Sequence, residues 1–212
     1  MSWICQQART PEEMDEVFRL RYLCYHAKGA IATRADRRFH DAYDELPNQF
    51  SFLLRGEDTT GSVRISVVRP ELGWHEAPSA TVFGDHPAFQ RIAACGFVEA
   101  SRLCFLPEAR RDVLYRLVAN LVALADYHGA PWVVACPREE HARFYTRIFG
   151  FHLLGEPRPY YGVNFRTALL AVPLEEIHQT AERIRSMRDS WSEALQAIAA
   201  TAGCAVPRLA AA

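Results

Sequence analysis

The chain has 212 residues, of which 50% are hydrophobic and 23% are charged, and its formal net charge is −1. This balance is typical of a globular protein with a sizeable core, and it lacks the basic excess of nucleic-acid-binding proteins. There is no apolar run of membrane-spanning length, and the six cysteines show no metal or disulfide spacing. We expect no secretory signal, because residues 1–7 lack a basic flank followed by an apolar core. We therefore expect a reduced, cytoplasmic protein with no nucleic-acid partner and no membrane insertion.

The first half of the chain is expected to contain one long helix and two strands. Thr10, Pro11 and two glutamates indicate a helix start, and apolar residues at helical spacing extend it to about Ala27. Residues 28–48 are polar and aperiodic, and long loops of this kind are often functional. Strands are expected over 49–55 and 61–69, and an irregular segment, rich in proline and glycine, over 71–94.

The second half is expected to alternate strands with helices. The expected strands cover 97–106, 132–136, 152–155 and 165–172, and the expected helices cover 108–128, 139–149 and 174–200. This order predicts one twisted sheet with helices on its faces. We expect one domain over 1–173, with 174–212 as a C-terminal helix and tail packed on it. The terminal helix either covers the core or serves a homodimer.

The segment over 141–151, HARFYTRIFGF, resembles the Phe-Tyr…Gly-Phe segment of GNAT acyltransferases. Four further motifs precede it: RYLCY at 21–25, DAYD at 41–44, GSVR at 61–64 and EASR at 99–102. Their succession resembles the acyl-homoserine lactone (autoinducer) synthases and the long-chain N-acyl amino acid synthases. The resemblance implies an α+β, GNAT-like fold, a three-layer α/β/α arrangement around a central mixed twisted sheet, and N-acyltransferase activity.

The resemblance also assigns roles to residues. The charged network that those families place beside the acyl-transfer site corresponds to Arg21, Asp41, Asp44, Arg64 and Arg102. Glu99 is the candidate base that takes the proton of the amine, directly or through water, and Tyr145 is the candidate acid for the leaving sulfur. A backbone N–H of Leu103 or Cys104 would polarise the thioester carbonyl.

Each of these roles has a simpler alternative. Glu99 is equally well explained as an ion-pair partner of Arg102 or Arg21, and Tyr145 as a packed core residue. The simpler alternative for the network is a set of unrelated exposed ion pairs, each of which stabilises the fold by about 0–1 kcal/mol. A nucleophilic Cys104 has no suitably placed histidine. Glu99 and Arg102 also point to opposite faces of a regular strand, so a shared site requires a bulge near 101–104.

The donor and acceptor follow from two departures from the family pattern. Where GNAT enzymes have a glycine-rich turn for coenzyme A, this chain reads LPEARR over 106–111. This favours an acyl carrier protein partner, whose phosphopantetheine arm carries one phosphate that Arg110 or Arg111 would meet, with acyl-CoA as the other possible donor. No tryptophan occurs between Lys28 and Asp41, where autoinducer synthases carry one, which favours a free amino acid over S-adenosylmethionine.

The remaining expectations concern ligands. An apolar tunnel for the acyl chain is expected, and its candidate lining residues are Phe83, Trp132, Val134, Phe144, Ile148 and Phe149. No tightly bound cofactor and no metal are expected, because the histidines show no ligand spacing. The leading hypothesis is an N-acyltransferase that moves a long acyl chain from an acyl carrier protein thioester to an amino acid. The alternatives are an acyl-homoserine lactone synthase, a coenzyme A-dependent N-acetyltransferase and a non-catalytic acyl-ligand binding protein.

Overall fold

The structure is a computed structural model that describes residues 4–56, 58–107 and 111–202. Its strands are β1 (Ile4–Gln7), β2 (Gln49–Arg55), β3 (Thr59–Val68), β4 (Phe97–Phe105), β5 (Trp132–Ala135), β6 (His152–Leu153), β7 (Arg158–Pro159), β8 (Arg166–Thr167) and β9 (Leu170–Pro173). Its α-helices are α1 (Pro11–Ala27), α2 (Pro78–Phe83), α3 (Pro87–Cys95), α4 (Arg111–His128), α5 (Ala142–Phe149), α6 (Leu174–Arg183) and α7 (Arg185–Ala202). Short 3₁₀ helices are η1 (Ala42–Glu45), η2 (Pro70–Leu72) and η3 (Glu139–His141).

Seven strands form one mixed sheet in the order β1-β2-β3-β4-β5-β9-β6, and β7 and β8 form a separate hairpin. Neighbouring strands are antiparallel except for β4 and β5, which run parallel. The β4–β5 pairing covers only three residues of each strand and stops at Ala100 and Ala135. Because β5 ends at Ala135 while β4 continues to Phe105, the two strands part in the middle of the sheet.

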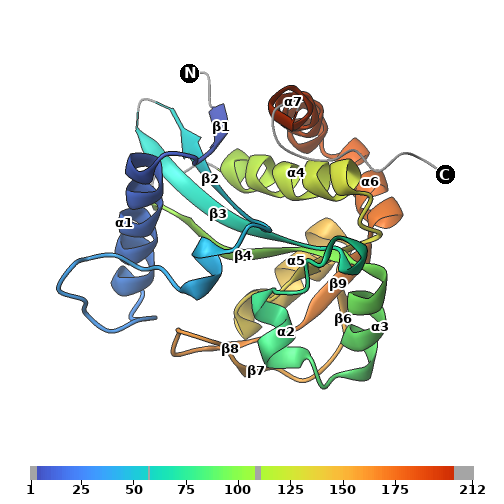
Figure 1. Cartoon of the computed structure of the whole chain (residues 1–212), viewed down its shortest axis with the longest axis horizontal. Coiled ribbons are helices and arrows are strands. Elements are labelled where there is room, and N and C mark those ends of the chain that lie inside the picture. The colour runs from blue at the N-terminus through green and yellow to red at the C-terminus, as the bar shows by residue number, and fades with distance from the viewer. Residues whose placement is uncertain (1–3, 57, 108–110, 203–212) are drawn as a thin grey trace.

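Helices cover both faces of this sheet, as predicted (Figure 1). On one face α4 lies along the strands, and α6 and α7 pack against it. The helices α1, α2 and α3 lie on the other face, and the 28–48 loop runs beside α1 (Figure 1). No helix among the described residues is long and apolar enough to cross a membrane.

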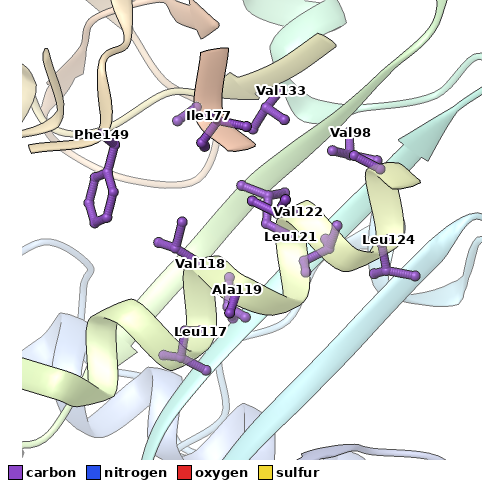
Figure 2. Close-up of a cluster of buried hydrophobic side chains, with 14 of the residues drawn as sticks. Val98, Leu117, Val118, Ala119, Leu121, Val122, Leu124, Val133, Phe149 and Ile177 are labelled. Carbon is purple, nitrogen blue, oxygen red and sulfur yellow. The ribbon is translucent and has the colours of Figure 1, made fainter. Parts of the chain in front are cut away.

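The main hydrophobic core lies between the sheet and α4. Figure 2 shows Leu121 and Val122 of α4 beside Val98 of β4 and Val133 of β5, with Ile177 of α6 close by. All five side chains are at most 1% exposed. Burial of apolar surface at roughly 25 cal/mol per Å² makes this layer the main support of the sheet. The opposite face carries a smaller core and a row of buried polar residues.

The sequence-based assignment of α1 is confirmed at its first residue. Thr10 accepts a hydrogen bond from the Glu13 N–H, and the Glu13 side chain accepts one from the Thr10 N–H. This capping box satisfies two N–H groups that otherwise lack a partner in the first turn. Pro11 follows at the first helical position, where its missing N–H costs nothing.

Three sequence-based assignments were wrong. The segment expected to be irregular contains α2 and α3, because Pro78 and Pro87 begin these helices rather than interrupt the chain. The terminal helix is two helices, since Ile184 takes an extended backbone conformation between them. Finally, β1 and β7 were not expected, because strands of four and two residues are too short for their alternation to be recognised.

Candidate active site

Five charged side chains meet on the face of the sheet that carries α1. Arg21 of α1 pairs with Asp44 at 2.7 Å, and Arg64 of β3 lies 2.6 Å from Asp41 and 3.1 Å from Asp44. Arg102 of β4 pairs with Asp41 at 2.7 Å. All five side chains are at most 5% exposed. Buried charges need such partners, so the residues form one connected network, not a set of exposed pairs.

The network attaches the 28–48 loop to the sheet. The Asp41 side chain caps η1 by accepting a hydrogen bond from the Tyr43 N–H, and the Asp44 side chain accepts one from the Asp41 N–H. Arg64, from β3, donates to both carboxylate oxygens of Asp41, and Arg102, from β4, donates twice to Oδ2. Burial by itself would raise the pKa of Asp41, but these two guanidinium groups outweigh it and lower the pKa to about 2.

The predicted irregularity of β4 is a bulge at Arg102 and Leu103. Ser62 pairs with Cys104 and Arg64 pairs with Ser101, so Val63 alone lies opposite both bulge residues. Arg102 adopts a φ of 52°, a left-handed conformation that non-glycine residues rarely take. The bulge turns the Arg102 side chain to the face that Glu99 occupies. The bulge lies just beyond Ala100, the last residue of β4 that pairs with β5.

Glu99 is completely buried on that face, with 0% of its surface exposed. One carboxylate oxygen accepts hydrogen bonds from the Ser79 N–H at 3.0 Å and from the Ser79 hydroxyl at 2.6 Å. The other accepts one from the Tyr160 hydroxyl at 2.8 Å. Burial raises the pKa of Glu99, and these three donors limit the rise. Among the described residues Glu99 has no ion pair, so the alternative of a partner for Arg102 or Arg21 is wrong.

The segment around β7 closes over Glu99 and Arg102. Tyr160 bonds to Glu99, and the carbonyl of Tyr161 accepts a hydrogen bond from Arg102 at 3.1 Å. Gly162 has a φ of 74°, and a Cβ atom there would lie 3.1 Å from the Arg102 guanidinium. Tyr160 and Tyr161 also line an open hollow of about 500 Å³, together with Thr81, Val82, Arg158 and Pro159.

Tyr145 lies on α5 and packs against the main hydrophobic core. Its ring packs edge-on against Phe144 and Phe151. Burial raises its pKa, and the nearby Tyr25 of α1 adds to the rise, so the hydroxyl is protonated at neutral pH. Among the described residues this hydroxyl has no hydrogen-bond partner, which leaves it free to donate to a ligand.

Comparison with known families connects this geometry to a reaction. The model of the family described as N-acyl amino acid synthase FeeM matches residues 16–173. The chain belongs to this family. As a FeeM-family protein it is an N-acyltransferase, which takes an acyl thioester as donor and an amine as acceptor. The predicted enzyme class is therefore confirmed. Comparison with curated proteins finds no match.

Solved structures show the same fold. The structure of FeeM, an N-acyl amino acid synthase from uncultured soil microbes, is 18% identical, with a TM-score of 0.70, over 84% of this chain and 94% of that one. BjaI, a coenzyme A-dependent acyl-homoserine lactone synthase, is 18% identical with a TM-score of 0.56 over 84% and 87%. The acyl-homoserine lactone synthase LasI is 14% identical with a TM-score of 0.61 over 82% and 90%. The predicted GNAT-like α+β fold is confirmed.

The structure of this FeeM-family chain corrects the expected acyl tunnel. Phe83, Trp132 and Val134 pack in the core on the α2–α3 face, whereas Phe149 packs under α4 on the opposite face. Phe144 is 42% exposed at the surface. Since Phe83, Trp132 and Val134 pack in one core cluster, Ile148 and Phe149 pack in another, and Phe144 lies at the surface, these side chains do not line one channel. Arg110 and the side chain of Arg111, expected to meet a phosphate, lie outside the described residues.

The environment of Cys104 does not suit a nucleophilic role. Its thiol is hydrogen-bonded with Cys24 of α1, and this contact together with burial raises its pKa well above the ordinary value. The thiol therefore stays protonated, whereas a nucleophilic cysteine needs a thiolate. Cys104 is also back in register with Ser62, so within the bulge Leu103 is the better candidate to offer a backbone N–H.

Two site residues escaped the sequence analysis: Ser79 and Tyr160, the partners of Glu99. Ser79 lies in the segment expected to be irregular, and Tyr160 lies 61 residues beyond Glu99. The adjacent tyrosines at 160 and 161, in an otherwise polar stretch, were the one available signal.

Proposed function

We propose that this N-acyltransferase moves a long-chain acyl group from an acyl carrier protein thioester to the amino group of a free amino acid. The observation that carries the proposal is the bulge at Arg102, placed where β4 and β5 part and on the same face as buried Glu99. A bulge frees backbone N–H groups, and a thioester in the gap between the strands would meet one.

The residues around the gap then supply the steps of acyl transfer. The Leu103 N–H donates to the carbonyl oxygen as negative charge develops there. The carboxylate of Glu99 takes the first proton of the ammonium group, which leaves a nucleophilic amine. Tyr145 donates its hydroxyl proton to the leaving sulfur and is reprotonated by the nitrogen of the new amide, directly or through water.

The hollow beside Tyr160 is the proposed acceptor site. It adjoins Glu99 through Tyr160, and Arg158 is the one charged residue among those that line it. Arg158 is paired with Asp85 of the α2–α3 turn and keeps a side-chain exposure of 35%. A guanidinium group suits the planar carboxylate of an amino acid, so this site favours an amino acid over a simple amine.

The donor can be identified by a direct competition. The purified protein is incubated with each amino acid and either a long-chain acyl carrier protein or the coenzyme A thioester of the same chain, and thiol release and product mass are measured. We expect thiol release and an N-acyl amino acid with the acyl carrier protein. Turnover with coenzyme A alone would overturn the proposed donor. An acyl-homoserine lactone formed from S-adenosylmethionine would overturn the proposed acceptor.

Arg158 tests the acceptor site separately. Arg158→Ala is expected to raise the KM for the amino acid about tenfold or more, because a charge-assisted hydrogen bond is worth roughly 1.5–3 kcal/mol. The KM for the thioester should not change. Asp85→Asn, which removes the competing carboxylate, is the matched variant and should lower the amino acid KM or leave it unchanged. Equal KM values in Arg158→Ala and the wild type would place the acceptor elsewhere.

A further inference from the structure

The burial of Glu99 limits how it can act. Its surface is 0% exposed, and its two oxygens are occupied by Ser79 and Tyr160. A general base must lie within hydrogen-bond reach of the proton that it removes, or be connected to it by one intermediate group. Among the described residues, two partners of the carboxylate carry a hydroxyl that could be such a group, Ser79 and Tyr160.

The two partners, Ser79 and Tyr160, differ in whether they line the hollow. Ser79 is itself 0% exposed, in the first turn of α2, and it is not part of the hollow. Tyr160 contacts Glu99 at its hydroxyl and also lines the hollow with Thr81 and Tyr161. Tyr160 is therefore the hydroxyl-bearing partner of the carboxylate that belongs to the lining of the hollow.

We propose that Tyr160 is a relay residue of the acyl transfer: its hydroxyl passes the proton of the acceptor amine, bound in the hollow, to Glu99. The inference rests on the proposed function, in which that hollow holds the acceptor. In this relay Glu99 does not contact the substrate. The Tyr160 hydroxyl lies between them, and it accepts a proton from the amine while it donates its own proton to Glu99.

The protons balance over the cycle. The ammonium of the acceptor gives one proton to the Tyr160 oxygen as Tyr160 gives its own to Glu99, so the amine becomes neutral and Tyr160 is unchanged. The neutral amine attacks the thioester carbonyl, the C–N bond forms and the C–S bond breaks. Tyr145 gives its proton to the sulfur, one of the two protons left on the nitrogen restores Tyr145, and the other stays on the amide. Protonated Glu99 then returns its proton through Tyr160 to the solvent.

The charges around the pair suit this role. Burial raises the pKa of Tyr160 well above its ordinary value, so it is a neutral hydroxyl at pH 7 and does not act as a base alone. Arg64 of β3 faces Glu99 and favours its ionised form. Arg102 of β4 faces Tyr160. Cys136, after β5, keeps its proton because burial and the Glu99 charge raise its pKa.

Tyr160→Phe tests the relay, because it removes the hydroxyl and keeps the ring. Rates are measured between pH 6 and pH 10 with whichever thioester and amino acid give thiol release with the wild type. We expect kcat at pH 7 to fall about 10²–10⁴-fold, the range typical of general base catalysis. The deficit should shrink toward high pH, where the amine is already neutral in solution and needs no relay.

Two variants serve as controls. Tyr127→Phe removes a tyrosine hydroxyl of α4, on the other face of the sheet, and should match the wild type. Ser79→Ala removes one of the three hydrogen bonds to the carboxylate without opening the hollow, and its deficit should be smaller than that of Tyr160→Phe at pH 7. Thermal unfolding of each variant verifies that it is folded.

The outcomes separate the relay from the proposed function. A folded Tyr160→Phe protein with a rate within twofold of the wild type at pH 7 would overturn the relay. A deficit that stays constant from pH 6 to pH 10 would also overturn it, since a purely structural role does not depend on the charge of the amine. Wild-type turnover with coenzyme A thioesters alone would refute the proposed donor, yet the same comparison would still test Tyr160.

Discussion

Asp41 and Glu99 are both buried carboxylates, yet their surroundings give them opposite properties. Asp41 lies between two guanidinium groups, which lower its pKa to about 2. Glu99 is held by two neutral side chains, and burial raises its pKa. A carboxylate with a raised pKa accepts a proton more readily, so Asp41 suits a structural role and Glu99 suits proton transfer.

Glu99→Gln tests that division of roles. The amide keeps the size of the side chain but does not accept a proton, so kcat is expected to fall about 10²–10⁴-fold with little change in the thioester KM. The kcat of Tyr145→Phe should fall less than that of Glu99→Gln. The exposed Glu156, replaced by glutamine, is the matched control and should leave steady-state rates unchanged. A Glu99→Gln protein that keeps a tenth or more of the activity would contradict a role in proton transfer.

Asp41 predicts how stability depends on pH. Its pKa is lower in the folded protein than the ordinary value of 3.8, so the ionised form stabilises the fold above pH 4. Roughly 2 kcal/mol of this stability should disappear as the pH falls from about 4 to about 2. Urea unfolding measured across this range checks the expectation.

Asp41→Asn should abolish that part of the pH dependence. It should also cost about 3–5 kcal/mol at neutral pH, because Arg102 stays buried without its counter-charge and Arg64 keeps only Asp44. If the variant and the wild type lose stability in parallel below pH 4, another group is responsible.

At the scale of elements, the 28–48 loop owes its position to the network and not to regular structure. Only η1 interrupts its irregular backbone, and Asp41 and Asp44 of that turn bind arginines of α1, β3 and β4. A loop held by a few buried ion pairs opens locally when one of them is removed.

Arg102→Ala should therefore increase cleavage of this loop by trypsin. The loop contains Arg34 and Arg37 as cleavage sites, and we expect cleavage there to become about tenfold faster or more, because opening costs less. Mass spectrometry of the fragments identifies the site. The exposed Arg91 of α3, replaced by alanine, provides the control. Unchanged cleavage would show that the loop is held by contacts other than Arg102.

At the scale of the whole molecule, α6 and α7 complete the core above α4. Met187 of α7 is 0% exposed within the main hydrophobic cluster, and the indole N–H of Trp191 donates to Asp126 of α4 at 2.7 Å. His178 of α6 stacks on Trp191 at 4.9 Å. These contacts support the proposal that the C-terminal region folds as part of the same domain.

Met187→Ala tests whether α7 and the sheet unfold as one cooperative unit. Loss of a fully buried methionine should lower the free energy of unfolding by about 2–5 kcal/mol, in one cooperative transition. Arg188→Ala, at an exposed position of the same helix, should change it by less than about 0.5 kcal/mol. If Met187→Ala leaves the main urea transition unmoved, α7 unfolds separately from the sheet.

The sequence by itself determined the long elements and the identities of the network residues. The 3.6-residue and two-residue periods are local properties, so α1, β2, β4 and α4 could be assigned without the fold. The residue types at 21, 41, 44, 64 and 102, in their order, indicated the family. The parity of β4 also showed that Glu99 and Arg102 would need a bulge to share a face.

Only the tertiary structure decided the partners of Glu99 and the division of the apolar residues between two faces. Ser79 and Tyr160 come from segments on either side of β4 in the sequence, 20 and 61 residues away from Glu99. Their meeting depends on how α2 and the chain after β7 pack on the sheet, which no local pattern encodes. A buried carboxylate takes whichever donors the packing brings to it, so its chemistry was decided by the fold and not by its own motif.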